Sequence, residues 1–200
     1  MTIGKLRLRP GFVLLAAALV YIDEGGLLWI TGVAALLHEA GHYIALRAAG
    51  GRVCLVELSA GGVSMVQAPL PRIGYGREIF AVLAGPLASL LSALLFSLGG
   101  GIIREYPAVG GLCLVQGLFN LLPARGLDGG RALWLILERA GARDARRVLC
   151  VTTALSAFFL AALGAALFFL SGGNLLPLVS AACVLPSLWV NAAKTNILGK

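Results

Sequence analysis

Long apolar runs separated by short polar connections set the organisation of this chain. Most of the six runs approach the roughly 20 residues that an α-helix needs to cross a bilayer. They lie at 10–22, 25–46, 78–98, 106–124, 148–171 and 174–192. The first is short for a span, so we expect it to begin near residue 6, with its basic residues snorkelling to the membrane surface. The pattern predicts an all-α membrane protein with six transmembrane helices.

The connection between the second and third runs has a different pattern. Residues 52–58 and 63–67 are short apolar stretches rich in valine, and a glycine-containing turn at 59–62 joins them. This arrangement predicts a short β-hairpin. Pro69 and Pro71 then end strand pairing before the third span begins.

The composition agrees with a membrane protein and excludes an ordinary soluble domain. Of the 200 residues, 59% are hydrophobic and only 12% are charged, and the mean hydropathy is +0.92. The four cysteines have no C-x-x-C spacing and lie in or beside apolar runs, so we interpret them as small buried hydrophobic residues. They are Cys54, Cys113, Cys150 and Cys183.

The distribution of charge predicts the orientation in the membrane. The net charge is +7, but the basic residues are scattered among the connections and form no face that would bind nucleic acid. One set of connections holds nearly all of them, so by the positive-inside rule that side, with the hairpin and both termini, is cytoplasmic. Its basic residues are Lys5, Arg7, Arg9, Arg47, Arg52, Arg72, Arg77, Arg139, Arg143, Arg146, Arg147, Lys194 and Lys200.

The second run contains the only two histidines of the chain, His38 and His42, with Glu39 beside the first. Two imidazoles one helical turn apart can reach one divalent ion such as Zn²⁺, and the neighbouring carboxylate can take a proton from water. The alternative is a chance polar stripe that faces the helix bundle. Ionisable groups inside an apolar span are costly unless they are paired or liganded, which favours the metal site. Gly41 suits close approach of another helix or of a substrate.

A catalytic zinc site needs a third protein ligand, and the chain has no third histidine. Among its nine acidic residues, Asp128 is the candidate, because, apart from Glu39, three of the others belong to the opposite membrane face and four lie in or near basic cytoplasmic connections where solvation explains them. The three are Asp23, Glu24 and Glu105, and the four are Glu57, Glu78, Glu138 and Asp144. A straight fourth helix would carry Asp128 about 33 Å from its start, too deep to meet His38 at about 20 Å. Pro123 and the glycines around Asp128 can break that helix and fold the chain back.

Three motifs together resemble the site-2 protease family of intramembrane metalloproteases. They are His38-Glu-Ala-Gly-His42, Ala84-Gly-Pro86, and Asn120-Leu-Leu-Pro123 followed by Leu127-Asp-Gly129. The resemblance covers nearly the whole chain and is closest to the compact six-span bacterial branch typified by the sporulation factor IVFB. Two features depart from that branch: Gly126 stands where proline is common, and the 200 residues contain no CBS-type nucleotide-sensing domain. Regulation by ATP through such a domain is therefore not expected.

The resemblance implies one zinc ion held by His38, His42 and Asp128, with Glu39 as the base that activates water. It implies a single polytopic protease domain over 1–200, with a catalytic core over about 25–131 and flanking spans at about 6–22, 148–171 and 174–192. The metal itself stays open on the residues alone, because two histidines and an aspartate also accept other divalent ions.

Two further residues are implied to bind substrate, namely Asn120 and Pro123. For Asn120 an alternative is that its side chain bonds to free carbonyls of the broken helix. Gly85 and Pro86 match a structural motif of the third span, where a packing role is favoured. The hairpin matches a family element that offers an edge strand to an extended substrate.

The implied function is intramembrane zinc metalloendopeptidase activity in a bacterial cell membrane. The substrate would be a membrane-spanning or membrane-associated protein cleaved near the cytoplasmic face, in regulated intramembrane proteolysis. The alternatives are a catalytically inactive homologue that binds membrane proteins and a divalent-metal transporter. The substrate, a regulatory membrane partner and homo-oligomer formation stay open.

Overall fold

The computed structural model describes residues 2–3, 6–8, 10, 13–14, 17, 20–21, 23, 26–51, 53–59, 62–67, 74–99 and 106–175. The expected first and last spans, at 10–22 and 174–192, lie largely outside these residues. The chain forms two compact units, Met1–Leu118 and Phe119–Lys200.

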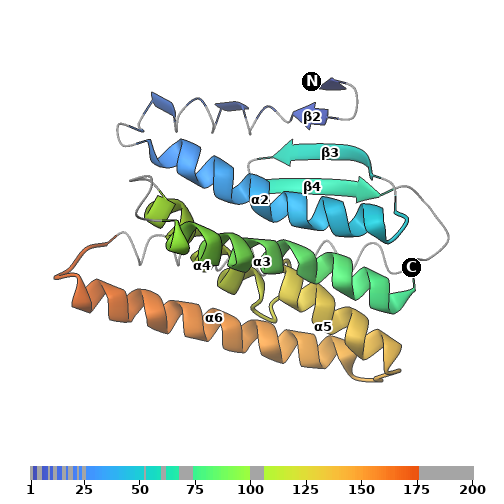
Figure 1. Ribbon diagram of the computed structural model, residues 1–200. Coiled ribbons are helices and arrows are strands. Elements are labelled where there is room, and N and C mark those ends of the chain that lie inside the picture. Colours follow the sequence, from blue (N-terminus) through green and yellow to red (C-terminus); the bar gives the residue numbers. More distant parts are fainter. Residues whose placement is uncertain are drawn as a thin grey trace. The chain divides into compact units, whose positions relative to one another are not determined.

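The first unit contains a small sheet and most of the long helices (Figure 1). Its strands are β1 (Thr2–Ile3), β2 (Leu6–Leu8), β3 (Val53–Ser59) and β4 (Gly62–Gln67). Its helices are α2 (Leu27–Ala48), α3 (Tyr75–Leu98) and α4, which spans Tyr106–Asn120 and so ends just past the unit boundary.

The four strands form one sheet in the order β1-β2-β3-β4. Strands β3 and β4 pair antiparallel, with Ser59 opposite Gly62, and β2 pairs parallel to β3. The strand β2 was not expected, because we assigned Leu6 and Leu8 to the first span. Leu6-Arg7-Leu8 alternates apolar and polar residues with the period of a strand, and the register places Arg7 opposite Glu57.

Helices α2 and α3 pack as an antiparallel pair. At one end Ile30 and Ala34 of α2 cluster with Ala93 of α3, and at the other end Ala45 of α2 clusters with Ala81 of α3. Most of these residues are small, which lets the two backbones approach closely. The pair therefore forms a close-packed interface along most of the length of both helices.

Both ends of α2 are capped by hydrogen bonds. The carboxylate of Asp23 accepts from the N–H groups of Leu27 and Leu28, at 2.9 and 2.8 Å. At the other end the N–H of Gly51 donates to Leu46 O at 2.9 Å, while Gly50 has a φ of 86° that suits glycine. These caps fix where the helix begins and ends.

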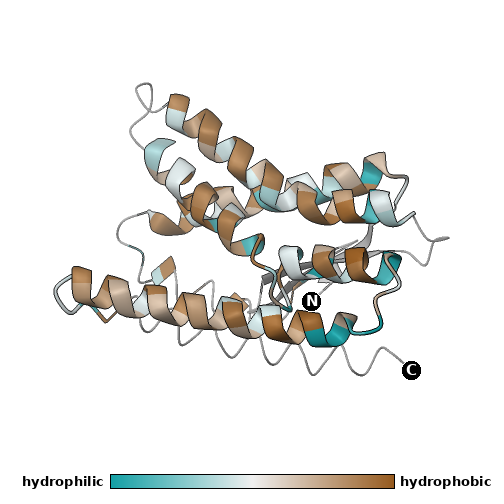
Figure 2. Cartoon of the chain, turned by 90° about the horizontal axis from the view of Figure 1, so that it is seen from below, coloured by the Kyte–Doolittle hydropathy of each residue, from teal (hydrophilic) through white to brown (hydrophobic). Residues whose placement is uncertain are grey.

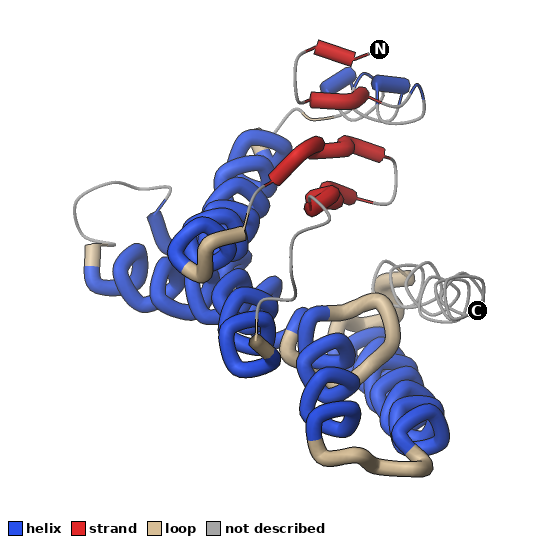
Figure 3. The backbone as a smooth tube through the Cα atoms, turned by 90° about the vertical axis from the view of Figure 1, so that its right-hand side faces the viewer, coloured by secondary structure: helices blue, strands red, loops and turns tan. Residues whose placement is uncertain are grey.

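The second unit consists of a turn and two helices, α5 (Asp128–Arg139) and α6 (Ala145–Leu170). Figure 3 shows the tan turns before and after α5. Helix α4 ends at Asn120, and turn residues follow before α5 begins at Asp128. The fourth helix is thus broken near Pro123, where the sequence contains the residues that can break it.

Two helices, α3 and α6, are long and apolar enough to cross a membrane by length and composition, within the part of the chain that the structure describes. Figure 2 shows α6 mostly brown, with polar residues at one end. Of the four cysteines expected to be buried, Cys113 is buried and Cys150 on α6 is exposed, while Cys54 and Cys183 lie outside the residues whose side chains the structure describes. Cys150 lies on a membrane-type helix, where an apolar surface can face lipid instead of protein.

Candidate metal centre

His38 and His42 lie side by side on one face of α2. Their Nε2 atoms are 3.3 Å apart, and the two rings meet edge to face with an interplanar angle of 81°. Two nitrogen ligands at about 2.0–2.1 Å from a tetrahedral ion are separated by about 3.3–3.4 Å. The spacing of the two nitrogen atoms therefore fits a shared metal ion.

The other nitrogen of each ring is held by α3. His42 Nδ1 donates to Ala81 O at 2.9 Å, because a carbonyl can only accept, so its Nε2 carries the lone pair. His38 Nδ1 lies 3.0 Å from the hydroxyl of Ser89, which is fully buried. When this Nδ1 donates to Ser89, both Nε2 atoms present lone pairs, as metal ligands must.

Two glycines make this arrangement fit between the helices. A Cβ at Gly41 would lie 2.5 Å from Ala84 O and 2.6 Å from Ala88 Cβ, so α2 and α3 meet here without a side chain between them. A Cβ at Gly85 would overlap the imidazole ring of His42, with Cδ2 at 2.5 Å. The close approach expected at Gly41 is thus made by another helix, and Gly85 leaves the room that the His42 ring occupies.

Glu39 follows His38 on α2 and is half-buried. The i, i+1 relation turns it by about 100° around the helix from His38. A carboxylate at this position is next to the histidine pair but does not lie on the helix face that carries both histidines. It can act on a group bound beside the pair, as a base rather than as a ligand.

The remaining candidates lie at the broken helix. Asn120 is the last residue of α4 and is half-buried, Pro123 is exposed in the turn, and Asp128 is the first residue of α5 and half-buried. We expected Asp128 on a folded-back loop, and it lies at the point where that turn becomes helix. Gly126 has a φ of 87°, which proline cannot adopt, so the turn here has a backbone that requires glycine rather than the family's proline.

The glycines after Asp128 allow the turn to pack closely on itself. A Cβ at Gly129 would meet the backbone of Leu121, whose carbonyl carbon would be 2.5 Å away. A Cβ at Gly130 would meet the backbone of Ala124, with the carbonyl carbon again at 2.5 Å. The first turn of α5 therefore sits directly on the turn before it.

Sequence reasoning missed two polar residues, Ser89 and Thr153. Ser89 binds His38, while Thr153 Oγ1 on α6 accepts from the N–H of Arg125 in the turn, at 3.0 Å. Their exposed fractions are 0% and 3%. Both hydroxyls stand in apolar runs, and a polar residue inside such a run was the signal that could have identified them.

The first comparison with known proteins concerns the fold. No protein-family model matches the chain. The structure is similar to that of the site-2 protease from Methanocaldococcus jannaschii, with a TM-score of 0.60 and 22% identity, over 96% of this chain and 93% of that one. The chain therefore has a fold similar to that of a site-2 protease.

A second comparison concerns sequence. The chain is 33% identical over 115 residues to a curated zinc metalloprotease of Methanocaldococcus jannaschii. The match includes 54% of this chain and 33% of that protein, so the chain spans about a third of the length of the curated relative. The chain is therefore similar in sequence to a zinc metalloprotease over about half of its length, and similar in fold to a site-2 protease.

Proposed function

We propose that this protein is an intramembrane zinc metalloendopeptidase. The observation that carries the proposal is the histidine pair, whose Nε2 atoms are 3.3 Å apart while both Nδ1 atoms are bound to α3. Two imidazoles inside an apolar helix cost free energy of desolvation, and binding a metal ion would offset that cost. The homology to a zinc metalloprotease supports zinc as the ion.

Asp128 is the third ligand in this proposal. Among the described residues, His38, His42 and Asp128 form a group of ligand side chains that could together hold a metal ion. Two imidazoles and one carboxylate leave a position open for water or substrate in a tetrahedral site. The donor set therefore suits catalysis better than a closed structural site.

The residues of the chain have separate roles in hydrolysis. A divalent ion at such a site supplies Lewis acidity that polarises a carbonyl and makes nearby water more acidic. Glu39 takes a proton from the attacking water and passes it to the leaving amine. Asn120 and Pro123 contact the substrate backbone beside the scissile bond.

The sheet supplies a way to hold the substrate extended. Among the strands that the structure describes, β4 is at one edge of the sheet, and the outer row of backbone groups of an edge strand can pair with an added strand. An added peptide strand would be held unfolded, which exposes peptide bonds that a closed helix hides. The substrate is a membrane-spanning or membrane-associated protein with a segment that can unwind.

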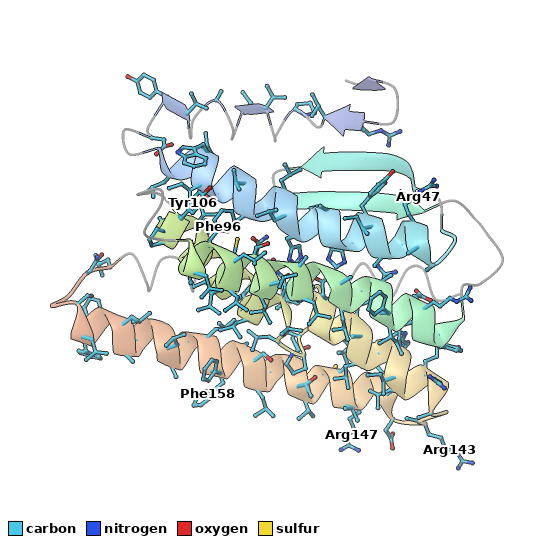
Figure 4. The ribbon with its side chains drawn as sticks, in the orientation of Figure 1. Arg47, Phe96, Tyr106, Arg143, Arg147 and Phe158 are labelled. Carbon is cyan, nitrogen blue, oxygen red and sulfur yellow. The ribbon has the colours of Figure 1, made fainter. Side chains whose placement is uncertain are left out.

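The proposal includes six spans, with both termini in the cytoplasm and cleavage near that face, in the compact sporulation-type branch of bacterial membrane proteases. The apolar helices α3 and α6 and the bias of basic residues support this topology. Arg143 and Arg147 extend outward near the start of α6 (Figure 4), as residues at a membrane surface do. Cleavage there would release a cytoplasmic fragment.

The test is Glu39→Gln in the full chain, with zinc content and cleavage of a model membrane substrate measured on the same preparation. We expect zinc to stay bound and cleavage to fall by about 100-fold or more, because the base is removed and the ligands remain. Normal cleavage by this variant would show that Glu39 is not the base. Zinc binding without cleavage by the unmodified chain would instead favour an inactive homologue or a metal transporter.

A further inference from the structure

Helix α6 is joined to the turn that carries Asp128 by a buried hydroxyl. Thr153 is 3% exposed. Its Oγ1 donates to Leu149 O at 2.6 Å and accepts from the N–H of Arg125 at 3.0 Å. The hydroxyl therefore uses both its donor and its acceptor capacity, and it satisfies a backbone N–H that has no helical partner.

The side chain of Arg125 makes a second connection to the same helix. Its Nη2 lies 3.1 Å from Cys150 Sγ and 3.5 Å from Arg146 O. Residues 146, 150 and 153 are spaced by three and four positions, so they lie on one face of α6. Both the backbone and the side chain of Arg125 thus attach the turn to that face.

The path from Arg125 to Asp128 is short and internally bonded. The N–H of Leu127 donates to Ala124 O at 3.1 Å, and the N–H of Arg131 donates to Leu127 O at 3.0 Å. Gly130 packs against the backbone of Ala124. If Arg125 shifts relative to α6, the start of α5 should therefore move with it.

We propose that α6 is a positioning element of the metal centre, acting through Thr153 and Arg125 on Asp128. This inference rests on the proposed function, in which Asp128 is a zinc ligand. Thr153 does not touch the ion. Thr153 fixes the position of the turn, and the position of the turn sets how strongly Asp128 binds zinc.

The experiment compares two neighbouring threonines of α6. Thr152 is half-buried and its hydroxyl bonds to Leu149 O at 3.2 Å, so Thr152→Val removes a similar helix bond. Thr153→Val removes in addition the partner of Arg125 N–H, and Thr153→Ser keeps it. The dissociation constant for zinc is measured on the full chain in detergent against a chelator series, together with the thermal unfolding of the zinc-free protein.

We expect Thr153→Val to raise the zinc dissociation constant about tenfold over Thr152→Val, and Thr153→Ser to stay within about twofold of the unmodified chain. The unfolding temperature of the zinc-free protein should fall more in Thr153→Val, because Arg125 N–H loses its buried partner, so both zinc affinities are measured at a temperature where both variants are folded. Equal zinc affinity in the two valine variants would overturn the inference. Should Thr153→Val not fold, Arg125→Ala takes its place: it removes the side-chain connection, and unchanged zinc affinity there would overturn the inference too.

Asp128→Ala separates this inference from the proposal beneath it. If Asp128→Ala binds zinc as tightly as the unmodified chain, the third ligand is elsewhere and both the proposed ligand set and the positioning role fail. If Asp128→Ala loses zinc while Thr153→Val matches Thr152→Val, the ligand set stands and only the role of α6 fails.

Discussion

The histidine pair and the turn that carries Asp128 are built in opposite ways, although both depend on glycine. The histidines lie between two long antiparallel helices, where Gly85 leaves space for a ring and Gly41 lets the backbones meet. The aspartate follows a short turn, where Gly126 supplies a backbone conformation and Gly130 lets one segment of backbone rest on another. On the histidine side glycine lets a ring and a second helix approach, and on the aspartate side it also sets the backbone conformation of the turn.

This difference predicts unequal stiffness. Both clusters of α2 and α3 lie in the same helix pair as the histidines, so moving a ring requires the helices to separate. The turn is held mainly by a few hydrogen bonds, among them the bond of Arg125 N–H to Thr153. Regions with few packed contacts open at lower free energy than a helix core. We therefore expect the metal site to loosen first on the aspartate side.

The largest effect should come from Gly85→Ala. Its Cβ would overlap the His42 ring, so the ring must turn away and lose its bond to Ala81 O. Zinc affinity should fall by about 100-fold or more, because a ligand is displaced. This loss is larger than the one expected when only a hydrogen bond to a ligand is removed. Zinc content after dialysis against a chelator, with cleavage of a membrane substrate, measures this.

The matched control is Gly76→Ala, near the start of the same helix, where a Cβ would meet nothing within 4 Å. An alanine there should bind zinc normally and stabilise the helix slightly. If Gly85→Ala retained zinc as well as Gly76→Ala, the room at Gly85 would not be what positions His42.

Two local features of the backbone were easier to predict from the sequence than the contacts between helices. The spacing of His38 and His42 and the break near Pro123 are local patterns with a direct structural meaning. Ser89 was missed, because its role depends on which residue of α3 faces His38 in the packed pair, and only three-dimensional register determines that.

The N-terminal strand shows a second limit. Leu6 and Leu8 were assigned to a span by hydrophobicity, yet they pair with β3, which is about 50 residues away in sequence. A segment of three residues carries too little pattern to separate a strand from a helix end. Pairing with a distant strand decided the outcome, and local sequence does not contain that information.

A smaller effect on the histidine side should come from Ser89→Ala. The change leaves His38 Nδ1 without its partner in the interior, so the ring loses orientation but remains in place between the helices. Zinc affinity should fall by about 10-fold to 100-fold, measured by competition with a chelator. Ser97→Ala, at an exposed position on the same helix, is the control and should leave affinity unchanged.

The smallest effect should come from Gly126→Ala, which tests the aspartate side. Gly126 and Gly141 both have positive φ, at 87° and 66°, so alanine at either position should cost about 1–2 kcal/mol of stability. Only Gly126 lies in the turn before Asp128, and its replacement should weaken zinc binding by a few-fold, about threefold to tenfold. Chelator competition and thermal unfolding of both variants separate the two effects. Equal zinc affinity in Gly126→Ala and Gly141→Ala would mean that the turn absorbs backbone strain without moving Asp128, and the aspartate side would then be as stiff as the histidine pair.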